Sequence, residues 1–550
     1  MTCSITYNGS EHSLTIGSRL SPLVLKELIR QHNIASCRYY IFKKSEHKQI
    51  KAVCTNKQCE YVCRASRPAK SPPETLYKVT ALKDHNCQLE DETTYTPPPP
   101  SSKYLASLSY IQEKISQNPS SKCSDLAVDL KQHVKVTVRK HMIKAMRRLC
   151  REQLFGSFED NFNQLSSYLE LLKSHNPGTV TALDLDEQFH RFFIAFGGTI
   201  CGYNYCRPLV QVDGTHLHNK YKQVLLTSST VDAQGQLFPL GFAVVSGENL
   251  DNWVWFFEQF QSCFGNNVVT FVSDREKGLL EAVRRVYPEA AHSYCLRHLA
   301  KNVGVRFSSL IWKAAKAESE DDLNNVLSEI RSESSKAYEK LVSAGLEHWT
   351  SVHFPGLRYG HLTSNLIESL NAWLLNVRGM PIVRMVNAIA EKLSLWFEKR
   401  FKEASDMKGT VSDKVFQKVK SLLSEAWQYE CTVVERSEDT FVKVTNDVRS
   451  FVVDVNNRSC SCQKWQLTGY PCSHGIAALL KLKRNIASGV DSYYYSENYK
   501  RTYGEGILPI DLSITLASVT ILPPEVKTGR GRPRIRRYKP GESQKRKESS

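Results

Sequence analysis

The sequence contains no apolar run approaching the ~20 residues that a membrane-spanning helix needs. The segment from Met1 to Asn8 also lacks the basic stretch and following apolar run that mark a secretory signal. We find no internal repeat of fixed period, which argues against a repeat architecture. These absences favour a globular protein that is neither anchored in a membrane nor exported.

The size and charge of the chain indicate several domains and a polyanionic partner. A chain of 550 residues is too long for a single hydrophobic core. Its content of 41% hydrophobic and 23% charged residues is ordinary for globular proteins. The formal net charge of +17 favours a polyanion, most commonly nucleic acid. A basic protein without such a partner is the alternative.

Sixteen cysteines are present, and many of them cluster with histidine. A large chain without an export signal argues for a reducing compartment, where Cys/His clusters more often bind zinc than form disulfides. Two sets of soft ligands have a spacing that suits tetrahedral Zn²⁺. Unrelated buried cysteines are the alternative, and Cys63 is an extra candidate ligand in the first set. The sets are Cys54, Cys59, His85 and Cys87, and Cys460, Cys462, Cys472 and His474.

Three acidic residues stand in contexts that suggest phosphodiester chemistry. Asp213 and Asp274 each close an apolar, strand-like run, and Glu368 opens an expected helix over 365–377. A sheet would hold the two aspartates rigidly against each other. Carboxylates gathered in this way bind a pair of Mg²⁺ or Mn²⁺ ions that promote in-line phosphodiester cleavage.

Other acidic residues in the same region have structural reasons to be there. Asp232 lies in an expected turn, where aspartate is common. Asp251 and Glu276 lie near helix starts, where negative charge is favoured. We therefore prefer Asp213, Asp274 and Glu368 as the catalytic set.

The order of expected elements around these carboxylates is that of an RNase H-like fold. Three strands are followed by a helix, a strand, a helix and a short strand. The fold class that we expect is a multidomain α/β protein whose RNase H-like catalytic core carries an all-helical insertion and is flanked by small zinc-binding modules. The elements are strands at 209–212, 224–231 and 237–245, a helix at 249–260, a strand at 267–273, a helix at 276–287 and a strand at 292–294.

The chain divides into seven expected regions. They are a Cys/His zinc-finger DNA-binding domain at 1–95, a proline-rich linker at 96–102, a helical, helix-turn-helix-like DNA-binding region at 103–180, a catalytic domain at 205–378 with a helical insertion at about 299–362, a helical region at 379–430, a second zinc module at 440–485, and a basic disordered tail at 523–550.

Two basic segments are candidates for contact with DNA. Residues 136–148 suit a recognition helix, although a solvated helix face explains them equally well. In the tail, Arg530, Arg532 and Arg534 belong to an Arg-Gly-Arg-Pro sequence, the core of an AT-hook that enters the minor groove. The same run suits a nuclear localisation signal or a nonspecific basic tail, and we expect a nuclear protein.

Several segments resemble Mutator-like element (MULE) transposases in order and approximate spacing. The resemblance implies a DDE transposase with Asp213, Asp274 and Glu368 as metal ligands. It also implies that Cys295 and His298, a Cys-x-x-His motif, lie near the active site, although a buried cysteine and a hydrogen-bonded histidine would explain them without a role. We do not assign this pair to zinc, because no second ligand pair is evident nearby. The segments are 213–217, 221–226, 232–243, 252–257, 273–279, 294–299 and 363–371.

The zinc modules have resemblances of their own. The Cys-x-Cys…Cys-x-His pattern of residues 460–474 resembles SWIM zinc fingers, which bind DNA or protein. The N-terminal set resembles the finger found near the N-terminus of MULE transposases, and we expect it to recognise the terminal repeats of the element. Basic residues around it suit contact with phosphates.

The function that we expect is cut-and-paste DNA transposition. The protein would bind transposon ends and target DNA, cleave DNA with Mg²⁺ or Mn²⁺, and join the freed 3′ end to the target. Pairing of two ends implies a dimer or larger homo-oligomer. The alternatives are a domesticated, transposase-derived transcription regulator and, less favoured, a nuclease acting on RNA–DNA hybrids, in which two DNA-facing zinc modules would have no obvious use.

Overall fold

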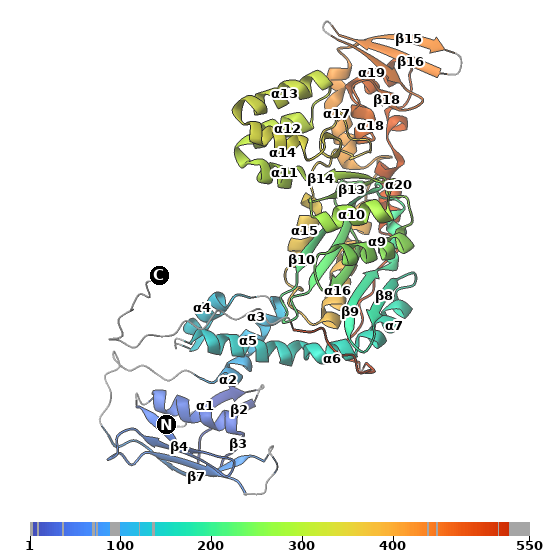
Figure 1. Ribbon diagram of the computed structural model, residues 1–550. Helices are drawn as coiled ribbons and strands as arrows, with labels where there is room; N and C mark the ends of the chain where they lie inside the picture. Colours follow the sequence, from blue (N-terminus) through green and yellow to red (C-terminus); the bar gives the residue numbers. More distant parts are fainter. Residues whose placement is uncertain are drawn as a thin grey trace, which may run out of the picture.

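The computed structural model describes most of the chain from residue 4 to residue 526 (Figure 1). The tail from 527 onward, with Arg530, Arg532 and Arg534, lies outside the described residues. None of the described helices is long and apolar enough to span a bilayer. The described ranges are 4–7, 10–35, 38–68, 72, 75–87, 100–119, 121–134, 138–436, 439–446, 449–514 and 516–526.

The N-terminal module is a five-stranded antiparallel sheet with one helix. Its strand order is β3-β7-β6-β5-β4, and a separate hairpin, β1 and β2, precedes it. Burial alternates along β5, so only one face of the sheet is covered. The helix α1 supplies Leu25, Leu28 and Ile29 to the core under that face. The bounds are β1 Ser4–Tyr7, β2 Ser10–Ser13, β3 Arg19–Leu20, α1 Pro22–Ala35, β4 Tyr40–Ser45, β5 Gln49–Cys54, β6 Val62–Ser66 and β7 Tyr77–Lys83.

Four helices, α2 to α5, lie between this module and a large central sheet (Figure 1). Their apolar faces share one core, to which α5 contributes Ile143, Met146 and Cys150. The next helices, α6 and α7, pack instead on the central sheet, so the expected helical region at 103–180 is divided between two cores. The bounds are α2 Ser102–Ala106, α3 Ser109–Gln117, α4 Cys123–Val134, α5 Lys140–Phe155, α6 Phe158–Asn163 and α7 Leu165–His175.

The central sheet has seven strands in the order β14-β13-β10-β11-β12-β9-β8. The pairs β10–β13 and β13–β14 are parallel, and the other pairs are antiparallel. The strands β8 and β9 extend the sheet to residue 180, before the expected domain start at 205. The bounds are β8 Val180–Leu185, β9 Phe189–Ala195, β10 Leu209–His216, β11 Val224–Val231, β12 Leu237–Val245, β13 Thr270–Ser273 and β14 Ala291–Tyr294.

Helices cover both faces of this sheet. The ring of Phe271 on β13 contacts Phe257 of α9 and Tyr287, which directly follows α10. The next residue, Val272, packs in a cluster that includes Leu366 of α15. Because successive strand side chains point to opposite faces, α9 and α10 cover one face and α15 covers the other. The bounds are α8 Gly197–Tyr203, α9 Leu250–Phe264, α10 Lys277–Val286, α15 Asn365–Trp373 and α16 Ile382–Ser405.

An all-helical unit separates β14 from α15, where the sequence predicted an insertion. Its helices have their own core around Trp349. It begins at Leu296, slightly before the expected start at about 299. The bounds are α11 Leu296–Val303, α12 Ser308–Ala315, α13 Glu320–Glu333 and α14 Ser335–Val342.

The C-terminal module is a four-stranded antiparallel sheet, in the order β15-β16-β17-β18, with helices α17, α18 and α19. Beyond it the chain forms α20 and returns to the central sheet, where Phe189 donates a backbone hydrogen bond to Leu522 (2.9 Å). The bounds are α17 Asp413–Ala426, β15 Glu430–Arg436, β16 Asp439–Thr445, β17 Ser450–Asp454, β18 Ser459–Cys460, α18 Lys464–Thr468, α19 Ser473–Lys481 and α20 Ser496–Thr502.

Candidate active site and metal centres

Asp213 and Asp274 lie at neighbouring positions of the central sheet. The parallel register pairs Gln211 of β10 with Val272 of β13, and each aspartate follows two residues later. Asp213 also accepts a hydrogen bond from Asn371 Nδ2 (2.8 Å), on the helix that carries Glu368. The two parallel strands and α15 therefore meet at Asp213.

The surroundings of Asp213 oppose its negative charge. Burial and, after it, the neighbouring carboxylates of Asp274 and Glu248 together raise the pKa of Asp213 to about 7. Such an excess of negative charge is what a divalent cation neutralises.

Glu248 is a fourth carboxylate that the sequence did not reveal. It lies between β12 and α9, and a Cβ atom at Gly214 would be only 2.5 Å from its Cδ. The carboxylate therefore packs over the glycine next to Asp213. Burial raises the pKa of Glu248, and Asp274 raises it too. The sequence signal was weak because Glu248 stands in a polar turn rather than at the end of an apolar run.

Glu368 is turned toward a cysteine, a histidine and an arginine. Its Oε2 lies 2.9 Å from Arg297 Nη1, and its Oε1 is buried without a hydrogen-bond partner. Ligand atoms of Glu368, Cys295 and His298 lie within 4.8 Å of one another. Among the described residues, the oxygens of Asp213, Asp274 and Glu368 do not form such a group. The third expected ligand is therefore on the helix that contacts Asp213, but its oxygens are not within 4.8 Å of those of both aspartates.

His298 connects Glu368 with the aspartates. Its interaction with the Cys295 thiol raises the pKa of His298, and the charges of Asp274 and Glu368 raise it further. Burial alone would raise the pKa of Cys295, but hydrogen bonds with His298 and Ser364 outweigh it and lower the pKa to about 7. The Cys-x-x-His pair thus lies next to the carboxylates, and Glu368 is a nearby third group that the sequence did not suggest.

The competing acidic residues have structural partners. Asp232 is fully buried and accepts hydrogen bonds from Tyr503 (2.8 Å) and the Gln236 backbone (2.7 Å). Asp251 pairs with Arg191 (2.9 Å), and Glu276 accepts from the Leu279 backbone at the start of α10 (2.7 Å). These contacts agree with the structural roles that the sequence indicated.

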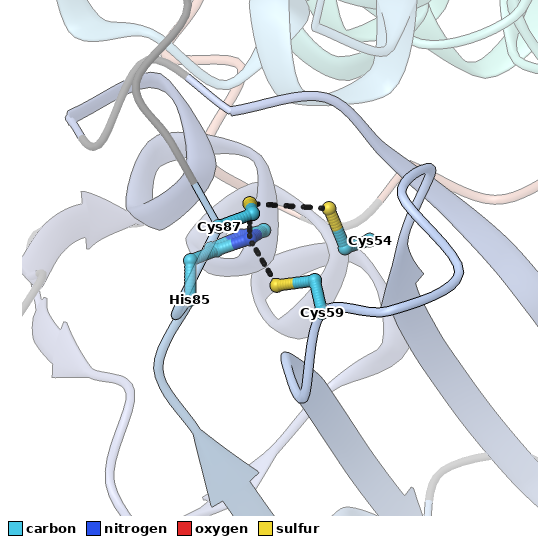
Figure 2. Close-up of side chains that lie close together, drawn as sticks. All are labelled: Cys54, Cys59, His85 and Cys87. Carbon is cyan, nitrogen blue, oxygen red and sulfur yellow. Dashed lines mark hydrogen bonds between the residues drawn. The ribbon is translucent and has the colours of Figure 1, made fainter.

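The four N-terminal ligand candidates converge (Figure 2). Their ligand atoms lie within 4.8 Å of one another, with Cys54 and Cys87 Sγ 3.8 Å apart and His85 Nδ1 3.4 Å from Cys59 Sγ. Tetrahedral zinc with Zn–S bonds of about 2.3 Å requires sulfurs about 3.8 Å apart, so the group fits the ion. Cys63 is not a member: it is fully buried in the core, and burial raises its pKa to about 12.

A second layer of contacts orients His85. Its Nε2 lies 2.8 Å from Asn33 Oδ1, so the ring N–H donates there and leaves Nδ1 for a metal. The ring of Tyr61 stacks on His85 at 4.0 Å and its hydroxyl accepts from Asn33. Burial lowers the pKa of His85 to about 4, which keeps the imidazole neutral as a ligand must be.

We expect Asn33→Ala to weaken zinc binding by the N-terminal module by about 10-fold or more, because His85 loses the partner that fixes its tautomer. Zinc release to a chromogenic chelator measures the effect. Thr80→Ala is the matched control, since Thr80 donates to the Arg64 backbone in the same sheet (3.2 Å) without contact with the ligands. Equal zinc affinity of the two variants would contradict the prediction.

The second cluster is built into the core of the C-terminal module. Cys462 and Cys472 Sγ are 3.6 Å apart, and His474 Nδ1 lies 3.7 Å from Cys460 Sγ. All four ligand candidates are buried, and Phe451 stacks on the His474 ring at 3.7 Å. These distances also fit tetrahedral zinc.

Comparison with protein families identifies two segments. The MULE transposase domain matches residues 209–302, which include Asp213, Glu248, Asp274, Cys295 and His298. The SWIM zinc finger matches residues 441–483, which include the second cluster.

Individual relatives match smaller parts of the chain. Protein FAR-RED IMPAIRED RESPONSE 1 of Arabidopsis thaliana is 25% identical over 28% of this chain and 19% of its own length. Protein FAR1-RELATED SEQUENCE 5 of the same plant is 23% identical over 32% of this chain and 22% of its own. The transposase for insertion sequence element IS905 of Lactococcus lactis is 23% identical over 38% of this chain and 57% of its own. The chain thus spans about a fifth of the plant relatives and just over half of the bacterial one.

Proposed function

We propose that this chain, which carries a MULE transposase domain and a SWIM zinc finger, is a DNA transposase that cleaves DNA at transposon ends and transfers the freed strand to target DNA. The observation that carries the proposal is the group of partly buried carboxylates beside Asp213 of β10 and the end of β13, where burial and like charge raise the pKa of Asp213 to about 7. Similarity to the IS905 transposase supports it.

We further propose that the central sheet is an RNase H-like core. The antiparallel run β10-β11-β12 followed by parallel β13 and β14 supports this assignment. The helices on both faces support it as well. In such a core the carboxylates of the first and fourth strands lie side by side, as Asp213 and Asp274 do.

Asp213, Asp274, Glu248 and Glu368 are the residues that would hold Mg²⁺ or Mn²⁺. Clustered like charges and the buried, unpartnered Oε1 of Glu368 fit a divalent cation. When bound, the cation supplies activation of the attacking oxygen and stabilisation of the leaving 3′ oxygen. Glu368 would first leave Arg297, whose side chain is 53% exposed and holds it weakly.

The zinc modules and helices would deliver DNA to this site. We propose Zn²⁺ in both Cys/His clusters, recognition of terminal repeats by the N-terminal module, and phosphate contacts by the basic side of α5. Two transposon ends must be brought together, so the active form would be a homo-oligomer. We place the reaction in the nucleus.

The test is excision and strand transfer by the full chain on DNA ends cloned from the flanks of its gene. Asp213→Asn, Asp274→Asn and Glu368→Gln should each abolish both reactions while DNA binding remains. Full activity of the three variants would refute the proposal.

Glu248→Gln tests the fourth carboxylate. We expect the Mg²⁺ concentration for half-maximal cleavage to rise by about 10-fold or more, because an oxygen ligand loses its charge. Glu258→Gln on the exposed side of α9 makes the same change of charge away from the site and serves as control. An unchanged Mg²⁺ dependence in Glu248→Gln would exclude a role in holding the cation.

A domesticated DNA-binding regulator is the second candidate. It is favoured by the similarity to three Arabidopsis thaliana proteins named for FAR1, whose names do not mention transposition. A regulator would keep its function when Asp213 and Asp274 are replaced by asparagine, whereas a transposase would lose it.

A further inference from the structure

A basic cavity lies beside the helix that leads from the N-terminal helices to the central sheet. It has a volume of about 290 Å³ and is formed by α5 from Lys144 onward, the start of α6, Lys220 and Pro381. Figure 1 shows α5 running directly into α6 at the edge of the sheet domain. Its charged lining residues are Lys144, Arg147, Arg148, Arg151, Lys220, Glu152 and Glu159.

The two acidic residues do not balance this charge. Glu159 forms an ion pair with Lys220, and Glu152 lies 3.9 Å from Arg148 on the exposed side of α5. Within the described part of the chain, no carboxylate pairs with Lys144, Arg147 or Arg151. The cavity therefore carries an excess of positive charge.

Arg151 has a donor without an acceptor. Its Nη2 is buried and makes no hydrogen bond. Burial, and then the nearby Arg147, lower the pKa of Arg151 to about 10, so the guanidinium stays charged at neutral pH. The guanidinium carbon of Arg151 lies over the Phe158 ring (5.9 Å), but this contact does not satisfy the buried Nη2 donor. An anion would satisfy both the charge and the donor.

We infer that this cavity binds a backbone phosphate of DNA, held by the forked guanidinium of Arg151 together with Arg147. A guanidinium presents paired N–H donors that match phosphate oxygens, and backbone phosphates position DNA without reading its sequence. The inference rests on the proposed function only in taking DNA as the source of the phosphate.

His218, which follows β10, lies near both the cavity and Arg378. Burial lowers the pKa of His218, and Arg378, Arg151 and Arg147 lower it further, so His218 lies within reach of all three charges. The His218 backbone donates to Arg378 O (2.8 Å), and Arg378 Nη1 donates to Thr215, two residues after Asp213.

Arg378 has a free donor of its own. Its Nε is buried without a hydrogen-bond partner, as is Nη2 of Arg151. A strand whose phosphate occupies the cavity would meet Arg378 on its way to the carboxylates. The cavity would thereby set which phosphodiester reaches Asp213.

The test is binding of the full chain to a duplex of mixed sequence across KCl concentrations of about 50 to 200 mM. Log K falls linearly as log[salt] rises, and loss of one phosphate contact decreases the magnitude of this slope by about 0.9. We expect this decrease for Arg151→Met, which removes the guanidinium but keeps an unbranched side chain of similar length, with binding weakened about equally for all sequences. Arg151→Lys should recover the slope but only part of the affinity. Lys336→Gln, an exposed charge on α14, is the control and should keep the wild-type slope.

The outcomes separate this inference from the proposed function. A wild-type slope in a folded Arg151→Met protein overturns the phosphate site, whatever the carboxylate variants do. If Arg151→Met destabilises the fold, Arg147→Gln, which removes the second guanidinium of the cavity, provides the same measurement. A reduced slope combined with full activity of Asp213→Asn would keep the phosphate site and refute the transposase.

Discussion

Asp213→Asn is expected to lower DNA cleavage by about 10³-fold or more and, in the same protein without metal, to raise the temperature of unfolding. The catalytic loss follows because asparagine offers a neutral oxygen where a charged ligand is required. The gain in stability follows because the negative charge of Asp213 is partly buried and is repelled by the carboxylates of Asp274 and Glu248. Asparagine removes this charge. Such a loss of stability is typical of active sites, where the destabilising groups are retained because the reaction requires them.

The sign of the stability effect comes from the pKa of Asp213. Burial raises it to about 7 in the folded protein, whereas an unfolded chain has an aspartate pKa of about 3.9. The folded state therefore binds the proton more tightly, and stability falls as pH rises between these values. Above pH ~7 the penalty is complete, with an upper bound of about 4 kcal/mol at ~1.4 kcal/mol per unit. Since Asp274 and Glu248 share the repulsion, we expect about 1–2 kcal/mol.

Thermal unfolding in EDTA at about pH 8 and about pH 5 measures the effect. The difference between Asp213→Asn and wild type should be largest at the higher pH and shrink at the lower one. The substitution keeps the local hydrogen bond, because the new amide oxygen can accept from Asn371 as the carboxylate does. Asp251→Asn, on an exposed ion pair, is the control and should show no such pH dependence. A destabilised Asp213→Asn would contradict the account of the site.

The parts of the site that could be predicted from the sequence are those fixed by local pattern. Asp213 and Asp274 each end an apolar run, and parallel pairing of β10 and β13 brings such ends together. Glu248 has no such pattern, because the turn that carries it is placed by the packing of α9 on the sheet. Its position over Gly214 depends on a contact between residues far apart in the chain.

The limits of the fold prediction have a similar origin. The strand β8 is only partly buried along its length, so its alternation is weak, and no sequence pattern predicts that the sheet begins at residue 180. The return of the chain after α20 depends on contacts such as Asn176 Nδ2 to Leu508 O (2.8 Å), which join residues more than 300 positions apart. The cysteine spacing predicted both ligand sets, but only packing showed that Cys63 belongs to the core.

Removal of zinc from the SWIM module is expected to unfold that module and leave the central sheet folded. The four ligand candidates are buried in the module's core with Val442, Val453 and Ile476, so loss of the ion would leave buried thiols and an imidazole without partners. Structural zinc contributes about 10 kcal/mol or more to small domains of this kind, which is comparable to the whole stability of a typical domain. The central sheet has a separate core and does not depend on this ion.

Cys462→Ser tests this expectation with hydrogen exchange resolved by segment. Amides of β16, β17 and α19 should lose protection by about 100-fold or more, whereas those of β11 and β12 should keep it. Cys431→Ser is the matched control, because Cys431 lies on β15 of the same sheet but outside the ligand group. Retained protection of α19 in Cys462→Ser would mean that the four residues form an ordinary apolar core. Loss of protection in both variants would mean that the module tolerates no polar substitution and that zinc is not the cause. Only the combination of an unfolded Cys462→Ser module and a folded Cys431→Ser module assigns the stability to the metal.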